Sequence, residues 1–313
     1  MQSSLCFALL ATAAALQAPM TRTQQRRVVA NRAPMDVLAP TSSALCAGAD
    51  DDDYSAPKIE FDPDAEERFT YPWAPDVDYN KRTELDTDNM TTTEVNSNIR
   101  ALMAEGYGTI VLKNPRGKHS LGVGILSRLN LIIEGSLGYF GVGLIDGPNV
   151  RINGRVGWSC GENMMAGTVV IEKNAGSTFG AAIRGGDLVC RGSVGSRTGI
   201  DQKGGTIIVG GDTGALSGFM MQRGRMIVCG NAGKNLGDSM YDGTIFVGGE
   251  IKSLGVDAVT AELTELDRNW LNSKLVQYGM LPEKGVDHFT KIVAGKQLWN
   301  YDNLEPNEKK LIL

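Results

Sequence analysis

Cut every 19 residues from position 157, the chain reads GWSCGENMMAGTVVIEKNA (157–175), GSTFGAAIRGGDLVCRGSV (176–194), GSRTGIDQKGGTIIVGGDT (195–213) and GALSGFMMQRGRMIVCGNA (214–232). Each block begins with glycine and has further glycines four and ten residues later. Self-similarity at a fixed period is the signature of a repeat architecture. A recurring glycine marks a corner where the backbone needs positive φ or leaves no room for a Cβ atom.

The repeat extends beyond these four blocks. The first glycine of each block belongs to a column of six turn glycines spaced 19 residues apart, Gly138, Gly157, Gly176, Gly195, Gly214 and Gly233. Two further columns have the same period: Gly161, Gly180, Gly199, Gly218 and Gly237, and then Gly167, Gly186, Gly205, Gly224 and Gly243. Three glycine columns at one period predict three corners in every repeat.

A strand lies between the corners. The columns seven and five residues before each turn glycine are apolar, for example Val150, Val169 and Leu188, whereas the columns eight and four residues before it are largely polar. This alternation predicts a strand with one buried face, and stacked copies form a parallel β-solenoid with about 4.8 Å between turns. A helix does not fit the alternating Val and Ile, and a disordered tract has no reason to keep apolar columns. We therefore expect an all-β chain with about seven 19-residue turns.

The column six residues before the turn glycine should point outward, yet six of its seven members are apolar: Ile132, Arg151, Val170, Val189, Ile208, Ile227 and Phe246. Such a stack needs cover, either from the chain itself or from a partner subunit. Two short helices are candidates. Residues 91–105 begin with the capping-box pair Thr91 and Glu94, and residues 262–278 place Leu263, Leu266, Trp270 and Leu275 on one face. We expect these helices to cap both ends of the solenoid.

The rest of the chain divides by composition. Residues 1–40, with an apolar run at 5–18 followed by an Arg-rich, Thr-rich and Gln-rich stretch, resemble a cleavable two-part targeting leader. We expect import into a plastid, with a mitochondrial or secreted protein as alternatives. Residues 41–90 form an acidic, proline-containing linker, 91–260 the solenoid domain with its N-terminal helix, and 261–313 a C-terminal helix and tail.

Composition also narrows the class of function. The net charge is −5, and loss of the basic leader makes it −8, which argues against nucleic acid or an anionic membrane as a partner. The only histidines are His119 and His288, which are 169 positions apart, and this scarcity argues against a Ser-His-Asp triad. The five cysteines include no CxxC pair, which argues against a zinc site or a disulfide scaffold: Cys6, Cys46, Cys160, Cys190 and Cys229.

A search by repeat phase finds no catalytic constellation. Glu162 and Asp238 share a phase but are four turns apart, so they do not form the carboxylate pair of a glycosidase. Cys160, Cys190 and Cys229 occupy three different phases, which does not suit an iron–sulfur cluster. We expect no catalytic, cofactor-binding or metal-binding residue, and the six turn glycines are assigned as structural positions.

The spaced motifs do resemble a known family. They are GRVGW (154–158), GENMMAG (161–167), GIDQKGG (199–205), SGFM (217–220) and GDSMYDG (237–243). Together they resemble the GXGXG domain that ends the large subunit of glutamate synthase, and most of all the stand-alone small subunit of N-methylglutamate-synthase-type complexes. The resemblance implies a right-handed parallel β-helix without catalytic residues, which braces an amidotransferase domain against an FMN-containing synthase domain.

The resemblance, together with the empty search, implies a scaffold function. We expect a non-catalytic subunit of a glutamate-synthase-like complex, with a glutaminase-type amidotransferase subunit and an FMN-containing synthase subunit as partners. FMN and an iron–sulfur cluster would then belong to the partner chains only. Two alternatives stay open. One is an independent β-solenoid interaction module without amidotransferase partners, and the other is a weak enzyme that acts on an acidic or sugar substrate.

Overall fold

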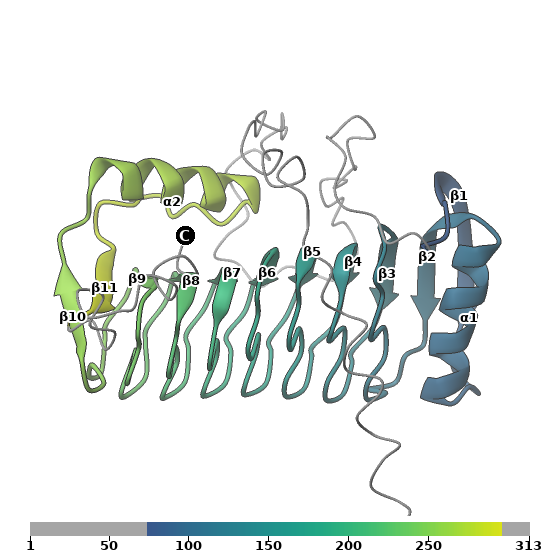
Figure 1. Cartoon of the computed structure of the whole chain (residues 1–313), viewed down its shortest axis with the longest axis horizontal. Coiled ribbons are helices and arrows are strands. Elements are labelled where there is room, and N and C mark those ends of the chain that lie inside the picture. The colour runs from purple at the N-terminus through teal and green to yellow at the C-terminus, as the bar shows by residue number, and fades with distance from the viewer. Residues whose placement is uncertain (1–73, 296–313) are drawn as a thin grey trace, which may run out of the picture. The chain divides into compact units, whose positions relative to one another are not determined.

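The computed structural model describes residues 74–295, which wind a single 11-stranded sheet into a β-solenoid with two short helices (Figure 1). The helices are α1 (Thr92–Ala104) and α2 (Glu265–Gln277). The strands are β1 (Asp78–Asp86), β2 (Tyr107–Lys113), β3 (Asn130–Glu134), β4 (Asp146–Ile152), β5 (Ala166–Ile171), β6 (Asp187–Cys190), β7 (Lys203–Val209), β8 (Arg223–Val228), β9 (Thr244–Val247), β10 (Ala258–Ala261) and β11 (Thr290–Ala294). The predicted leader (1–40), part of the predicted linker and the end of the predicted tail lie outside the described residues.

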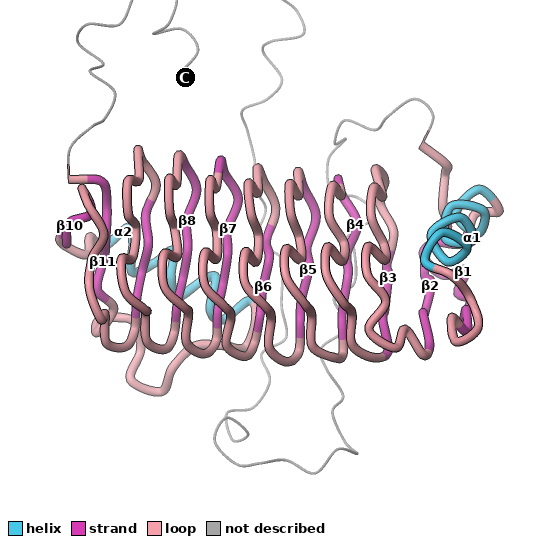
Figure 2. Tube along the Cα trace, turned by 90° about the horizontal axis from the view of Figure 1, so that it is seen from below, coloured by secondary structure: helices cyan, strands magenta, loops and turns pink. Residues whose placement is uncertain are grey.

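Strands β3 to β9 carry the 19-residue repeat. They pair in parallel in chain order, and each residue pairs with its equivalent one turn later, as in Val150 with Val169 and Val169 with Leu188. Figure 2 shows these strands side by side along one wall, with the loops of each turn closing the other two sides. The seven-turn parallel solenoid predicted from the apolar columns is confirmed.

Apolar side chains from all three sides of each turn fill the interior. The two predicted inward columns are fully buried, and Phe179 and Met164 enter the same cluster from the loops. Each such side chain stabilises the fold by roughly 1.5 to 3 kcal/mol relative to an exposed one. The loop column of Phe179 is not apparent as an apolar pattern in the sequence, because Thr198 and Ser217 occupy its places in later turns, whereas the column of Met164 is apolar in every turn except at Gln202.

Helix α1 closes the N-terminal end of the solenoid. Its Val95, Ile99 and Met103 are buried in the interior cluster. The predicted capping box is present: the Glu94 backbone N–H donates to Thr91 Oγ1 (3.3 Å), and the Thr91 backbone N–H donates to Glu94 Oε2 (2.7 Å). An N-terminal cap of this kind satisfies two helix donors and fixes where the helix begins.

The linker assignment needs a correction at its C-terminal part. Residues 78–86 lie in the predicted linker but form β1, which pairs in parallel with β2 at the edge of the sheet. The sequence hides this strand because most of its side chains are exposed and charged, with Leu85 among the few that pack on the core. Charged edge strands resist pairing with a further chain.

Helix α2 lies along the side of the solenoid, above β6 to β9 (Figure 1), rather than across its C-terminal end. It and the segment after it cover the outward apolar column at Val170, Val189, Ile208, Ile227 and Phe246. The expectation that the chain covers its own outward stack is confirmed. The C-terminal end is closed instead by β11, which pairs antiparallel with β9, and by β10, which pairs with β11.

The buried face of α2 differs in part from the predicted one. Leu275 is buried, but Leu266 is 81% exposed, and Leu271 takes its place against the solenoid. Leu263 is buried just before the helix begins. The helix begins after Thr264, whose hydroxyl accepts from the Asp267 backbone N–H (3.2 Å). Leu266 and Leu275 are nine residues apart, about two and a half turns, and so lie on opposite faces, whereas Leu271 shares the face of Leu275.

Polar contacts fasten α2 to the sheet. Asp187 Oδ2 on β6 accepts from Lys274 Nζ (2.5 Å) and from the Tyr278 hydroxyl (2.6 Å). The guanidinium of Arg225 on β8 lies 4.4 Å from the ring centroid of Trp270. Asp187 and Arg225 are the charged members of a column that otherwise holds Asn and Thr, so the departures from the repeat coincide with the contacts to the helix.

Candidate interaction surface

The turn glycines form one flat side of the solenoid. In the column Gly138, Gly157, Gly176, Gly195, Gly214 and Gly233, none has positive φ, and a Cβ on any of them would lie 2.2 to 2.7 Å from an atom of the preceding turn. At Gly157, for instance, it would lie 2.7 Å from the carbonyl of Gly138. These six residues, which we call the glycine wall, are therefore glycine because adjacent turns approach too closely for a side chain.

The other two glycine columns have a second cause. Gly161 (φ +71°) and Gly167 (φ +104°) represent columns in which every glycine has positive φ. This backbone conformation costs an L-residue roughly 1 to 2 kcal/mol, whereas glycine adopts it freely. Of the three columns, positive φ is confined to these two, whereas close approach contributes in all three, since a Cβ on Gly167 would lie 2.3 Å from the carbonyl oxygen of Pro148.

Three rings lie flat against the glycine wall at its N-terminal end. His119 stacks on Tyr139 with centroids 4.7 Å apart, and Tyr139 stacks on Trp158 at 5.3 Å. His119 Nδ1 accepts a hydrogen bond from the Tyr139 backbone N–H (2.8 Å), which fixes the first ring. A Cβ on Gly176 would lie 2.6 Å from Trp158 Cδ1, so the indole covers the next glycine of the wall. Together with the neighbouring Phe140 and Leu144, these residues form what we call the aromatic patch.

A hydrogen-bonded ladder runs along the corner two residues before the glycine wall. Asp212 Oδ1 accepts from the Asn231 backbone N–H (2.6 Å), and Asn231 Oδ1 accepts from the Glu250 backbone N–H (2.8 Å). Earlier rungs use Ser136, Asn174 and Ser193 as acceptors in the same way. Each rung joins a side chain to the backbone one turn later, so the ladder stiffens the corner without occupying the adjacent wall.

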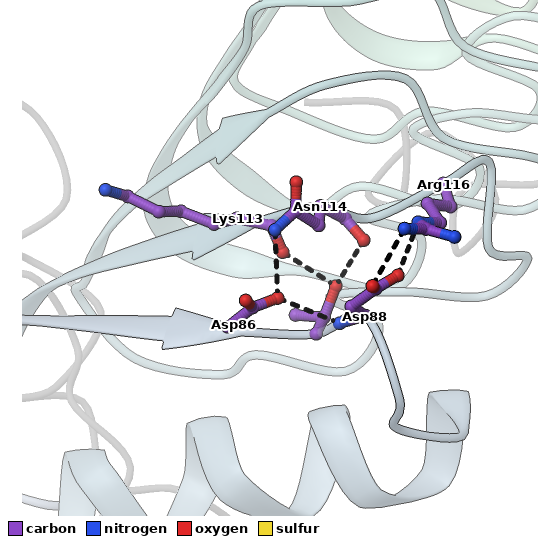
Figure 3. A network of polar contacts seen from close by, with 6 residues as sticks. Asp86, Asp88, Lys113, Asn114 and Arg116 are labelled. Atoms are coloured by element: carbon purple, nitrogen blue, oxygen red, sulfur yellow. Dashed lines mark hydrogen bonds and ion pairs between the residues drawn. The ribbon is translucent and has the colours of Figure 1, made fainter.

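A polar network at the end of β1 and β2 joins the carboxylates of Asp86 and Asp88 to the side chains of Asn114 and Arg116 (Figure 3). Asp88 pairs with the Arg116 guanidinium, whose Nη2 lies 2.8 Å away. Asp86 Oδ1 accepts from Asn114 Nδ2 (3.0 Å) and from the Asp88 backbone N–H (3.0 Å), and the hydrogen bond from Asn114 is the main cause that lowers the pKa of Asp86. The buried Thr87 hydroxyl donates to the carbonyl of Lys113 (2.9 Å). Since both carboxylates are engaged in joining the strand ends, the network serves the fold.

The titratable residues singled out in the sequence do not assemble. His119 lies in the aromatic patch, whereas His288 packs against Phe289 beside β9 and β11 with the two rings tilted by 50°, and burial lowers the pKa of His288. Cys160, Cys190 and Cys229 are free thiols, and burial raises the pKa of Cys190 and Cys229 to about 12. Within residues 74–295 no three His, Cys, Asp or Glu side chains are placed to hold a metal ion. In the same range no helix has the length and apolar character needed to cross a membrane.

These features define a class: a parallel β-solenoid with its outward apolar column covered by its own helix and with successive turns in close contact at a column of glycines. The chain belongs to the GXGXG motif family, whose match spans residues 89–306 and hence more than half of the chain. This range contains the glycine wall, the aromatic patch and α2. A search of curated proteins finds none with significant similarity.

Proposed function

We propose that the chain is a non-catalytic scaffold subunit of a glutamate-synthase-like complex. Its partners would be a glutaminase-type amidotransferase subunit and an FMN-containing synthase subunit, and those chains would carry the FMN and the iron–sulfur cluster. The single observation that carries the proposal is the family match over residues 89–306. The motifs GENMMAG and GDSMYDG favour the stand-alone small subunit of N-methylglutamate-synthase-type complexes as the particular form.

The physical character of the solenoid supports this role. Every turn is hydrogen-bonded to the next along the strands and again at the corner ladder, and apolar side chains fill the interior. Such a body keeps its shape when other subunits bind to its sides, because each repeat is held by both neighbours. The basic and apolar composition of residues 1–40 supports a plastid as the place where the complex works.

Affinity capture from the native organelle tests the proposal. The full chain, tagged at its C-terminus, should co-purify with glutaminase-like and flavin-binding chains, identified by mass spectrometry and by a flavin absorbance scan. The purified chain alone should release no glutamate from glutamine. Recovery as a lone monomer would instead favour the independent interaction module, and turnover of glutamine or a sugar by the pure chain would favour the enzyme.

A further inference from the structure

Exposed apolar side chains concentrate in the aromatic patch. Tyr139, Phe140, Leu144 and Trp158 are 43%, 50%, 55% and 57% exposed, and they are half of the large hydrophobic residues exposed in the described part of the chain. They lie within 20 residues on two consecutive turns. Single exposed apolar residues need no explanation, but a contiguous cluster of this kind marks an interaction site.

The fold itself does not require these side chains. Phe140 and Leu144 have φ values of +58° and +55°, in the left-handed region where a bulky residue is strained. The same two columns hold Ser159 and Asn163 one turn later and Leu216 and Met220 four turns later, all with positive φ, and Asn tolerates this conformation best among non-glycine residues. About half of each side chain stays exposed, so the fold gains little apolar burial in return for the strained backbone. A polar residue would therefore suit the solenoid better at both positions.

The ring stack is a preorganised anchor. Stacking on the glycine wall holds the Tyr139 and Trp158 rings in place before any partner arrives, so little side-chain entropy remains to be lost on binding. The stack stops at Trp158, because the next residue in the column is Ser177. Fixed, half-exposed Trp and Tyr rings are the side chains that most often dominate binding energy at protein interfaces.

Four cations without an ion pair lie on the turns of the aromatic patch or close to them in the sequence. Arg155 and Lys173 are exposed on the two turns of the patch, Arg197 is exposed two turns beyond Trp158, and Lys118 precedes His119. None of the four takes part in an ion pair among residues 74–295. Among the carboxylates of the same two turns, Glu172 pairs with Arg151 and Arg191, whereas Glu162 accepts a hydrogen bond from Asn163 Nδ2 (3.4 Å) and keeps its charge. On a protein with a net charge of −5, this local excess of free cations favours a partner with carboxylates.

We propose that the aromatic patch is the docking point for a partner subunit of the complex, one that presents an apolar side chain to Trp158 within a rim of Asp and Glu. This inference rests on the proposed function and names the surface through which it acts. A single-stranded nucleic acid could also stack on such rings, but the net negative charge of the chain opposes it.

The test compares variants of the full chain for binding to the flavin-containing chain that the wild-type protein captures, measured by biolayer interferometry. Trp158→Ala should weaken binding by at least about tenfold. Arg155→Glu should weaken it about tenfold and reduce its dependence on salt. The matched controls are Leu266→Ala, which removes a side chain 81% exposed on α2, and Lys234→Glu, which lies in the same outward column as Trp158 but four turns away. Both controls should change binding less than about twofold.

The outcomes separate the two proposals. Failure of the wild-type chain to capture a flavin-containing chain refutes the proposed function. Capture by the wild type with undiminished binding by Trp158→Ala and Arg155→Glu refutes the docking surface and leaves the function standing. If single-stranded oligouridylate displaces the flavin-containing chain and binds more tightly than that chain does, the assignment of the patch to a protein partner is also refuted. Unchanged circular dichroism and urea midpoints show that the variants are folded, so weakened binding is then attributable to the surface.

Discussion

Replacing Gly157 by alanine tests why the glycine wall exists. The added methyl would lie 2.7 Å from the carbonyl carbon and oxygen of Gly138 and 2.6 Å from Tyr139 Cδ1. The backbone conformation of Gly157 is one that alanine adopts freely, because its φ is not positive. The substitution therefore changes only the space between two turns.

The magnitude follows from the required displacement. Relief of the clash needs about 0.8 Å of separation, since carbon atoms pack at about 3.5 Å or more. The hydrogen bond from Gly157 N–H to Gly138 O, now 3.0 Å, would then exceed hydrogen-bond length. Overpacking costs about 1 to 3 kcal/mol and the lost hydrogen bond about 1 kcal/mol, while the stiffer unfolded chain offsets about 0.5 kcal/mol. We expect a net loss of about 1.5 to 3.5 kcal/mol in the free energy of unfolding.

Urea unfolding followed by circular dichroism and tryptophan fluorescence measures this loss. Gly117→Ala is the matched control, because a Cβ there meets nothing within 4 Å although φ is +68°. It isolates the cost of the left-handed backbone, about 1 kcal/mol. If Gly157→Ala destabilises the protein no more than Gly117→Ala does, close approach of the turns is not the reason for the wall.

Three further predictions concern the fastening of α2, pH and the thiols. Asp187→Asn should cost about 2 kcal/mol and speed hydrogen exchange in α2, because it removes the charge opposite Lys274, whereas Asp242→Asn should leave exchange unchanged. Burial raises the pKa of Asp267, but hydrogen bonds from Lys291 and Thr264 outweigh it, so the pKa lies below 3.8. Its contribution to stability is thus present above pH 3.8 and lost as the pH falls below that value, and urea midpoints of Asp267→Asn should drop less between pH 7 and acid than those of the wild type. Cys160 and Cys190 should react with a thiol reagent only after unfolding, as mapped by peptide mass spectrometry, because both are buried and their pKa values are raised; labelling of the native protein would contradict this.

The repeat made most of the fold predictable. Val150, Val169 and Leu188 pair in the register that their spacing gives, because one period applies to every turn and an error of one residue would turn the whole buried face outward. The outward column from Val170 to Phe246 likewise predicted a covering element, since a stack of exposed apolar side chains needs cover.

Features that the sequence did not predict lie at positions that break the 19-residue period or depend on contacts between distant segments. Leu266 and Leu271 lie on different faces of α2, and only the packing of the helix on the sheet shows that the face with Leu271 and Leu275 is the buried one. β1 escaped notice because its charged side chains carry no alternating pattern. The aromatic patch could have been found by reading across the repeat, since Tyr139 and Trp158 stand one turn apart in the same column.

The length of α2 matches the part of the solenoid between β6 and β11. The helix has 13 residues and so spans about 20 Å, which equals about four inter-strand steps, the distance from β6 to β11. Lys274 of the helix contacts Asp187 on β6, and Asp267 contacts Lys291 on β11, so both contacts depend on the number of strands between β6 and β11. Duplication of a 19-residue turn before β6 would lengthen the solenoid and keep both contacts. The same duplication between β6 and β9 would break one of the two contacts, so the solenoid can be extended only on the N-terminal side of β6.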